Sequence, residues 1–508
     1  MPDRDTLPNP GIRPPTAGPR EWFGLAVLAL PTLLLTMDVS VLYLAVPHLT
    51  EDLRPTGIEQ LWIADIYGFM IAGFLITMGT VGDRIGRRRL LMLGAAGFGA
   101  ASALAAFATS PVLLIVARAL LGIAGATLMP STLALISNMF RDAGQRGLAI
   151  AVWATCMSAG MAVGPIVGGV LLESFWWGSV FLLGIPVMAL LLVTAPTVLP
   201  EHRDASAGSI DLPSVLLSLA TILPVIYGIK QLSEAGLSTV PLAAIAVGGV
   251  AGWIFVRRQR ELDDPLLDLR LFRNRSFCAA LLVLLLSLAL VGGMYLFMTQ
   301  YLQLVQGLSP LAAGLWLLPS AFALIVASLL TPSIARTIAP GHLVGAALAV
   351  STLGYVLLTL VDSRSGLPLL VTGFVLVYIG TSPLMVLGTD LVVGAAPPAK
   401  AGSAAAMSET SMEFGVAVGV AVLGVVGTAI YRRDPGPAQA GAAAADSLAG
   451  AVTADLPVNL RDAVLASARD AFTDGLNTVA LTCAVIAALL AVTATVLLRP
   501  TDTDSPTT

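Results

Sequence analysis

Long apolar runs separated by short polar segments cover almost the whole chain. As a helix rising ~1.5 Å per residue, each run can cross the ~30 Å hydrocarbon core of a bilayer. The pattern predicts fourteen spans, at 22–46, 58–80, 89–109, 111–137, 147–172, 177–199, 211–230, 238–256, 277–303, 310–334, 341–361, 367–391, 403–430 and 476–498. An even number of spans places both ends of the chain on the same side of the membrane.

The spans predict an all-α membrane protein with two six-helix bundles, 22–199 and 277–498, and an inserted segment, 200–276, that holds two extra central helices and a linker. The tails 1–21 and 499–508 are expected in the cytoplasm, and no removable signal peptide is expected. The long segment 431–475 is expected to form an extracellular loop. Its stretch Leu460 to Phe472 has helical apolar spacing, so it either lies along the membrane surface, caps the protein, or is a plain surface linker.

Composition agrees with a multi-pass membrane protein. The 508 residues are 56% hydrophobic and 11% charged, with a mean hydropathy of +0.88. A net charge of -4 spread over short loops gives no reason to expect a nucleic-acid partner. Cys156, Cys278 and Cys483 lie far apart in apolar segments, so we expect core packing and neither a metal site nor a disulfide framework.

The basic residues predict the orientation. With the N-terminus in the cytoplasm, most of the 27 Lys and Arg residues fall on the cytoplasmic side, as the positive-inside rule requires. Those expected outside are Arg54, Lys230, Arg364, Arg432, Arg433, Arg461 and Arg469. We therefore expect a protein of a bacterial cytoplasmic membrane with both termini inside.

Five charged residues interrupt the apolar runs at depth: Asp38, Asp65, Arg118, Glu409 and Glu413. Charges at such depth are costly and are typical of proton relays and of sites for charged solutes. Asp38 lies ~24 Å from the inner start of its helix, and Asp65 and Arg118 each lie ~10 Å from the outer start of theirs. If these helices adjoin, the three residues could form an Asp-Arg-Asp group. Snorkelling to the interface is the alternative for Arg118.

Glu409 and Glu413 are four residues apart and therefore share one face of the helix at 403–430. They would repel each other unless they are protonated or bound to a cation. Burial favours the protonated form of a carboxylate, and a lipophilic cation can displace that proton, which is the physical basis of an exchanger. The alternative is that either glutamate only faces a watery vestibule.

The turn between the second and third spans combines glycines, an acid and basic residues: Gly79, Asp83, Arg84, Gly86, Arg87 and Arg88. The orientation rule explains the arginines alone. The spacing suits a tight turn whose charge pair makes or breaks as helices move. The order of these residues resembles the most recognisable signature of the major facilitator superfamily.

The span at 147–172 holds a second motif, formed by Gly160, Gly164, Pro165, Gly168 and Gly169. Glycines four apart let helix backbones approach closely, and ordinary small-residue packing would explain that spacing. The order Gly-Pro-x-x-Gly-Gly is also similar to the motif of drug:proton antiporters within the superfamily.

The first span, around Met37, Asp38 and Tyr43, resembles that of the fourteen-helix drug:proton antiporters that export quaternary ammonium compounds and cationic dyes. Arg118 with Gly122 and Gly125 looks like a motif linked to proton transfer in that family. The resemblance implies a proton-driven monomer without catalytic activity, cofactor or metal, whose partners are protons, small lipophilic cations and membrane lipids. Tyr43 replaces the asparagine common in this group.

Several aromatic residues could offer a ring face to a planar cation, although core packing or an interfacial belt would also explain them. These are Trp62, Tyr67, Trp153, Tyr295, Phe297 and Trp316.

The sequence therefore predicts a proton-coupled exporter of amphipathic cationic drugs that works by alternating access. A dedicated exporter of one antibiotic would have the same features. An ATP-driven pump would need a Gly-Lys-Ser/Thr phosphate loop, which is missing, and a channel gives no reason for the Pro165 motif. A membrane receptor or scaffold would not need Asp38 and Glu409 buried.

Overall fold

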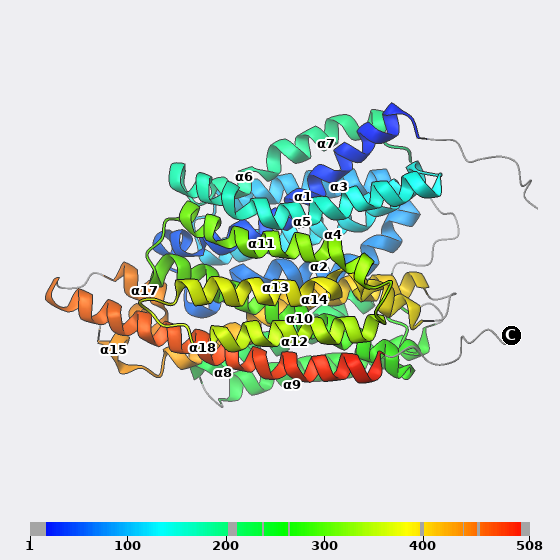
Figure 1. Cartoon of the computed structure of the whole chain (residues 1–508). Helices are drawn as coiled ribbons and strands as arrows, with labels where there is room; N and C mark the ends of the chain where they lie inside the picture. Colours follow the sequence, from blue (N-terminus) through cyan, green and yellow to red (C-terminus); the bar gives the residue numbers. More distant parts are fainter. Residues whose placement is uncertain are drawn as a thin grey trace, which may run out of the picture.

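The computed structural model describes residues 17–201, 211–235, 238–262, 265–396, 401–439, 441–454 and 458–498. These residues are almost entirely helical (Figure 1). Among them, fourteen segments are long and apolar enough to cross a membrane. The predicted all-α membrane fold is confirmed. Residues 1–16 and 499–508, in the predicted tails, lie outside the described residues.

The N-terminal half contains α1 (Pro19–Leu53), α2 (Gly57–Ile85), α3 (Arg87–Ala106), α4 (Pro111–Met139), α5 (Ala143–Ser174), α6 (Ser179–Leu182) and α7 (Gly184–Val198). The two inserted helices are α8 (Leu212–Ala235) and α9 (Thr239–Glu261). The C-terminal half contains η1 (Leu271–Arg273), α10 (Arg275–Gln300), η2 (Tyr301–Val305), α11 (Pro310–Ile334), α12 (Pro340–Leu358), α13 (Leu367–Gly394), α14 (Ala401–Tyr431), α15 (Pro435–Ala438), α16 (Ala442–Asp446), α17 (Leu448–Thr453) and α18 (Val458–Leu497).

Local sequence fixes where these helices begin and turn. Thr56 caps α2 by accepting the N–H of Glu59, whose side chain accepts the N–H of Thr56 in return. Ser110 and Ser309 cap α4 and α11 in the same position, each directly before a proline. Gly86, between α2 and α3, has a φ of 111°, a conformation that favours glycine.

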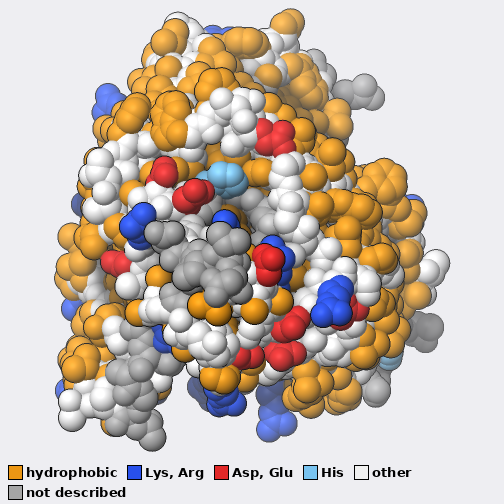
Figure 2. All heavy atoms as spheres, turned by 90° about the vertical axis from the view of Figure 1, so that its left-hand side faces the viewer, with side chains coloured by type: hydrophobic (Ala, Val, Ile, Leu, Met, Phe, Trp, Pro, Cys, Tyr) orange, Lys and Arg blue, Asp and Glu red, His pale blue; other side chains and the backbone are white. Residues whose placement is uncertain are grey.

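The helices run between two ends of the molecule. The terminal end carries the start of α1 and the end of α18, and the opposite end carries α15, α16 and α17 (Figure 1). Viewed onto the opposite end, charged side chains gather on the end face while apolar side chains cover the flanks (Figure 2). Exposed apolar residues on the flanks include Leu216, Val247, Trp253, Phe322 and Leu329. This distribution fits a protein whose flanks face lipid.

Helices pack across the boundary between the halves mainly at two places. α2 packs against α14, and α5 packs against α11. The inserted helix α8 lies over the first of these contacts, because its Ile226 belongs to one buried apolar cluster with Phe69 of α2 and with Ala417 and Ala421 of α14. We call the α2–α14–α8 contact the seam.

The last helix differs from the prediction. The sequence predicted a span at 476–498 after a loop at 431–475, whereas α18 begins at Val458 and continues to Leu497 over 40 residues. At ~1.5 Å per residue it is ~60 Å long, about twice the hydrocarbon thickness. Its first part extends beyond the neighbouring helices at the opposite end, beside α15 and α17 (Figure 1).

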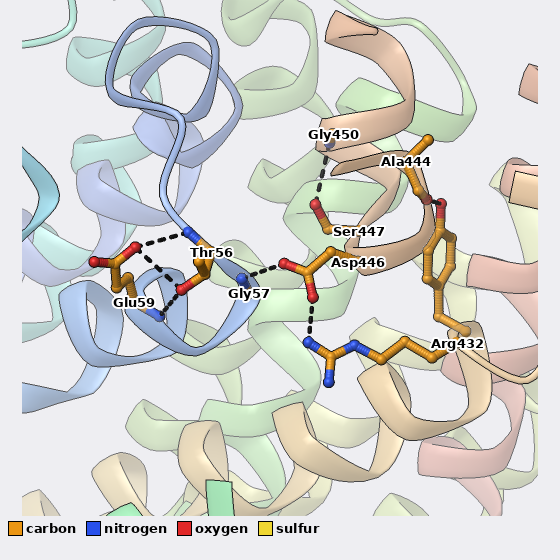
Figure 3. A network of polar contacts seen from close by, with 9 residues as sticks. Thr56, Gly57, Glu59, Arg432, Ala444, Asp446, Ser447 and Gly450 are labelled. Atoms are coloured by element: carbon orange, nitrogen blue, oxygen red, sulfur yellow. Dashed lines mark hydrogen bonds and ion pairs between the residues drawn. The ribbon is translucent and has the colours of Figure 1, made fainter. Parts of the chain in front are cut away.

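Hydrogen bonds join the two halves at the opposite end. Asp446 of α16 accepts the backbone N–H of Gly57 of α2 at 2.5 Å and also pairs with Arg432 (Figure 3). Gln303 Nε2 donates to the carbonyl of Leu44 at 3.1 Å. Between described residues, no hydrogen bond joins the two halves at the terminal end. The opposite end is therefore the more tightly closed of the two.

Candidate functional site: a central cavity with buried acids

A cavity of about 200 Å³ lies between the two halves, near the middle of the helices. Its walls come from α1, α2, α5, α10, α11, α13 and α14, and they combine acids with tyrosines and methionines. The acids are Asp65, Glu409 and Glu413, the tyrosines are Tyr43, Tyr67, Tyr295 and Tyr378, and the methionines are Met157, Met161, Met385 and Met412. Apolar, adaptable walls with a few polar groups are typical of small-molecule sites.

A second and larger cavity of about 700 Å³, which we call the vestibule, lies at the terminal end. Its lining includes Asp83, Arg87, Trp153 and Asp211. Glu409 lines both cavities and so marks the place where the vestibule meets the central cavity.

Asp38 and Arg118 form a buried ion pair. Arg118 Nη1 lies 2.5 Å from Asp38 Oδ2, and the arginine side chain is completely buried. Arg118 Nε donates to the carbonyl of Ile63 at 3.3 Å, and its guanidinium carbon lies 4.5 Å from the centre of the Tyr67 ring. Snorkelling of Arg118 is therefore wrong, because the side chain turns into the bundle and ties α4 to α1 and α2.

The predicted Asp-Arg-Asp group does not form. Asp65 pairs with Lys230 of the inserted helix α8, whose Nζ lies 2.7 and 3.0 Å from the two carboxylate oxygens. Both side chains are completely buried. Equal depth placed Asp65 near Arg118, but the side chain points to the other flank of α2, where α8 packs. The prediction that Lys230 lies outside the membrane is also wrong, because α8 packs against α2 and buries Lys230 beside Asp65.

Glu409 and Glu413 lie one helical turn apart on α14, and both face the central cavity. Both are half-buried. Among the described residues neither forms an ion pair with a lysine or arginine, in contrast to Asp38 and Asp65. This pair is the part of the site with uncompensated negative charge.

The predicted aromatic contacts divide by position. Tyr67 and Tyr295 line the central cavity, and Trp153 lines the vestibule while its Nε1 donates to Thr132 at 3.2 Å. The other three lie elsewhere: the Trp62 ring packs 3.7 Å from Lys230 Nζ, Phe297 packs against Phe472, and Trp316 is exposed on the surface. Tyr67 Oη is buried without a hydrogen-bond partner among the described residues.

The turn between α2 and α3 contains the predicted charge pair, but with a different partner. Asp83 pairs with Arg87 at 2.5 Å, whereas Arg84 is exposed. Arg87 begins α3 after the break at Gly86, and its side chain reaches back to Asp83 near the end of α2. Arg88 donates to the carbonyls of Pro196 and Leu199 at the end of α7. Gly79 lines the vestibule with Asp83 and Arg87.

The glycines of the α5 motif lie against α1 on one side and α11 on the other. Gly160, Gly164 and Gly168 face Leu33, Met37 and Val41 of α1. A side chain at Gly169 would collide with the backbone of Leu311 of α11, and the Pro165 carbonyl lies directly against Gly314. The motif therefore forms the second contact between the halves, next to the cavity that Pro165 helps to line.

Sequence reasoning missed Lys230 and the methionines. Lys230 stands where a long apolar run ends, so the sequence predicted it on the outer side of the membrane, although α8 continues to Ala235. Lys230 lies five residues before the end of α8, at the opposite end of the molecule, and its depth is close to that of Asp65 in α2. This similar depth was the signal available in the sequence.

Two helical bundles around an acidic central cavity, all within a membrane-spanning fold, define a membrane transporter. The chain belongs to the Major Facilitator Superfamily, whose family model matches residues 28–420.

Curated relatives and solved structures agree with this assignment. The chain is 45% identical over 482 residues to the multidrug efflux pump LfrA of Mycolicibacterium smegmatis, covering 94% of this chain and 95% of the relative. It is 34% identical to the methyl viologen resistance protein SmvA of Salmonella typhimurium, covering 79% and 82%. A bacterial homolog of the human lysosomal transporter Spinster, solved in an inward-facing, unoccupied conformation, has the same fold with a TM-score of 0.66, 14% identity and coverage of 96% and 100%.

Proposed function

We propose that this protein exports amphipathic cationic drugs in exchange for protons by alternating access. The observation that carries the proposal is the pair Glu409 and Glu413, which faces the central cavity with no lysine or arginine partner among the described residues. Carboxylates in a desolvated apolar cavity need either a proton or a cation. Proton and drug therefore compete for the same negative charge.

The cavity walls suit such a ligand. Four tyrosines line the cavity, and a cation over an aromatic ring gains about 0.5–2 kcal/mol. Methionines adapt to ligands of different shape. The unpartnered hydroxyl of Tyr67 supplies one polar contact. These features support a broad range of planar cations rather than one rigid ligand.

The path follows from the position of Glu409. We infer that the protein lies in a bacterial cytoplasmic membrane with both termini in the cytoplasm, so the vestibule faces the cytoplasm and this conformation is inward-facing. A cation that enters the vestibule reaches Glu409 first and Glu413 one turn deeper. Closure of the terminal end and opening of the opposite end would then release it outside.

The relatives support export of drugs. Their names describe a multidrug efflux pump and a methyl viologen resistance protein, and the first matches nearly the whole chain. We infer that the protein works as a monomer in contact with membrane lipids and needs no cofactor, since the proton gradient supplies the free energy.

The test is ethidium efflux from proteoliposomes under an imposed pH gradient, with wild type beside Asp38→Asn and Glu409→Gln. We expect efflux that requires the gradient and is lost in both variants. Glu261→Gln is the matched control, because Glu261 is an exposed carboxylate on α9 that pairs with Arg257 and lines neither cavity.

Two results would contradict the proposal. Wild-type efflux that is unchanged when the gradient is collapsed would remove proton coupling. A wild type that moves no ethidium, while remaining folded, would favour a dedicated exporter of a single uncharged antibiotic.

A further inference from the structure

A buried lysine of an inserted helix touches an acid of the central cavity. Lys230 of α8 is completely buried, and its Nζ lies 2.7 and 3.0 Å from the two oxygens of Asp65. Asp65 lines the central cavity. One of the two inserted helices therefore contributes a charged side chain to the site, in addition to any contact with lipid.

The ammonium group has a second partner. Its Nζ lies 3.7 Å from the centre of the Trp62 ring, one turn before Asp65 on α2. A cation over a tryptophan face is stabilised even without a carboxylate. If Asp65 becomes neutral, the Lys230 charge therefore remains partly compensated inside the protein.

This pair lies where the halves meet. Around it, Phe69 of α2, Ile226 of α8 and Ala417 of α14 form one apolar cluster, with Trp62 and Phe414 at its edge. The apolar contacts of α8 reach both halves, and the ion pair of Lys230 with Asp65 joins α8 to α2. Breaking the ion pair would thus change how α2 is held at the seam without removing α8 from it.

Lys230 is the cation in direct contact with Asp65. The other charged or titratable groups near this part of α2 are Asp38 and Tyr43 of α1, Arg118 of α4, and Glu409 and Glu413 of α14. Arg118 is held by Asp38 and by the carbonyl of Ile63. The acids around the cavity would disfavour a charged Asp65, and Lys230 opposes them.

We propose that Lys230 is a positioning residue for the proton-coupled step, holding Asp65 charged and α2 bound to α8 until a proton arrives. This inference rests on the proposed proton-coupled export. A proton binds to the Asp65 carboxylate and forms a neutral acid, while Lys230 keeps all its protons and stays over Trp62. The ion pair is then lost, and α2 becomes free to move at the seam.

The test compares four variants reconstituted in proteoliposomes with ethidium as the probe. Lys230→Met removes the charge at similar length, Lys230→Arg keeps it, and Lys230→Met with Asp65→Asn removes both charges. Arg257→Gln is the matched control, because it breaks an exposed ion pair within α9, with Glu261, without touching α2. The readouts are gradient-driven efflux against pH and ethidium exchange at equal concentrations without a gradient.

We expect Lys230→Met to move the pH of half-maximal efflux upward by about one unit or more, because Asp65 without its cation keeps its proton to higher pH. Gradient-driven efflux near neutral pH should then fall about tenfold, while exchange changes less than about twofold. Lys230→Arg should retain gradient-driven efflux, and Arg257→Gln should follow wild type. The double variant should exchange ethidium but remain uncoupled from the gradient.

Two outcomes would overturn the inference alone. One is a Lys230→Met variant with wild-type rate and pH profile. The other is a double variant that regains full gradient-driven efflux, since the pair would then be purely structural. If Lys230→Met does not fold, the double variant and Lys230→Arg still decide between these outcomes. Wild-type efflux that ignores the gradient would instead overturn the proposed function.

Discussion

The two halves of the molecule hold their buried acids in different ways. In the N-terminal half, Asp38 contacts Arg118 and Asp65 contacts Lys230, in both cases at ion-pair distance. In the C-terminal half, Glu409 and Glu413 share one face of α14 and have no such partner among the described residues. All but Asp38 line the central cavity.

This difference assigns different roles to the acids of the two halves. A buried carboxylate with a cation is stabilised in its charged form, so it changes state only when a proton breaks the pair. A carboxylate without a cation is open to any positive ligand of suitable shape. The N-terminal half is thus suited to conformational control and the C-terminal half to ligand choice.

The largest effect is expected from Asp38→Asn, which leaves the buried Arg118 charge without its carboxylate. Breaking a buried pair by removing one partner costs about 3–5 kcal/mol. We expect export to be abolished while the protein still folds. Ethidium efflux and size-exclusion chromatography measure the two quantities.

Asp38→Asn with Arg118→Met is the control, because it removes both charges. It should recover thermal stability but not transport. Transport by the single variant at the wild-type rate would contradict the role assigned to the N-terminal half.

Glu413→Gln should change ligand choice and leave conformational control intact. Loss of one carboxylate from the cavity should weaken ethidium binding about tenfold, or about 1.4 kcal/mol, and change which cations are accepted. Uncharged ligands should bind as before. Fluorescence anisotropy of the purified protein gives these affinities, with Glu261→Gln as the control; equal weakening for charged and uncharged ligands would point to a damaged cavity instead.

Asp446→Asn tests an acid of the C-terminal half that does have a cation. Asp446 accepts the N–H of Gly57 and pairs with Arg432 at the opposite end, where water is near (Figure 3). Partly exposed pairs contribute about 0–1 kcal/mol, so we expect at most about a fivefold change in the balance between conformations. The accessibility of a cysteine introduced into the vestibule lining should decrease slightly. A complete loss of transport would assign Asp446 a larger role.

The smallest effect is expected at Asp362, an exposed acid outside the membrane-spanning helices. Hydrogen bonds from the backbone and hydroxyl of Ser365 and from the backbone of Arg364 lower the pKa of this carboxyl. Because its pKa is lowered in the folded state, this carboxyl stabilises the fold at pH values above the ordinary pKa of an aspartate. The contribution is lost as the pH falls. The melting temperature of Asp362→Asn should therefore lie slightly below wild type at neutral pH and match it in acid; a constant difference at all pH values would contradict this.

The spans could be predicted because each crossing needs a long apolar run, and the sequence contains fourteen. The start of α18 could not, because its first part goes beyond the length that a span needs and mixes apolar with charged residues from Leu460 to Phe472. Sequence alone does not distinguish an amphipathic extension of a helix from a separate surface helix.

The depth of the site residues along their helices could be predicted, but not the direction in which their side chains point. Depth along the helices placed Asp38 near Arg118, and they do form a pair. The same argument placed Asp65 with them, although it faces α8 and Lys230. Depth follows from counting residues, whereas the neighbours of a face depend on how helices pack, and the sequence gives no direct measure of that.

The length of α18 has a practical consequence for following the transport cycle. Its first turns lie ~30 Å beyond the middle of the helix, at ~1.5 Å per residue, and it packs along α12 and α14. If the C-terminal half tilts by ~10° about its centre, simple lever geometry moves the tip by ~5 Å. The distance between a spin label there and one at the start of α2 would report the motion of one half against the other from outside the bilayer.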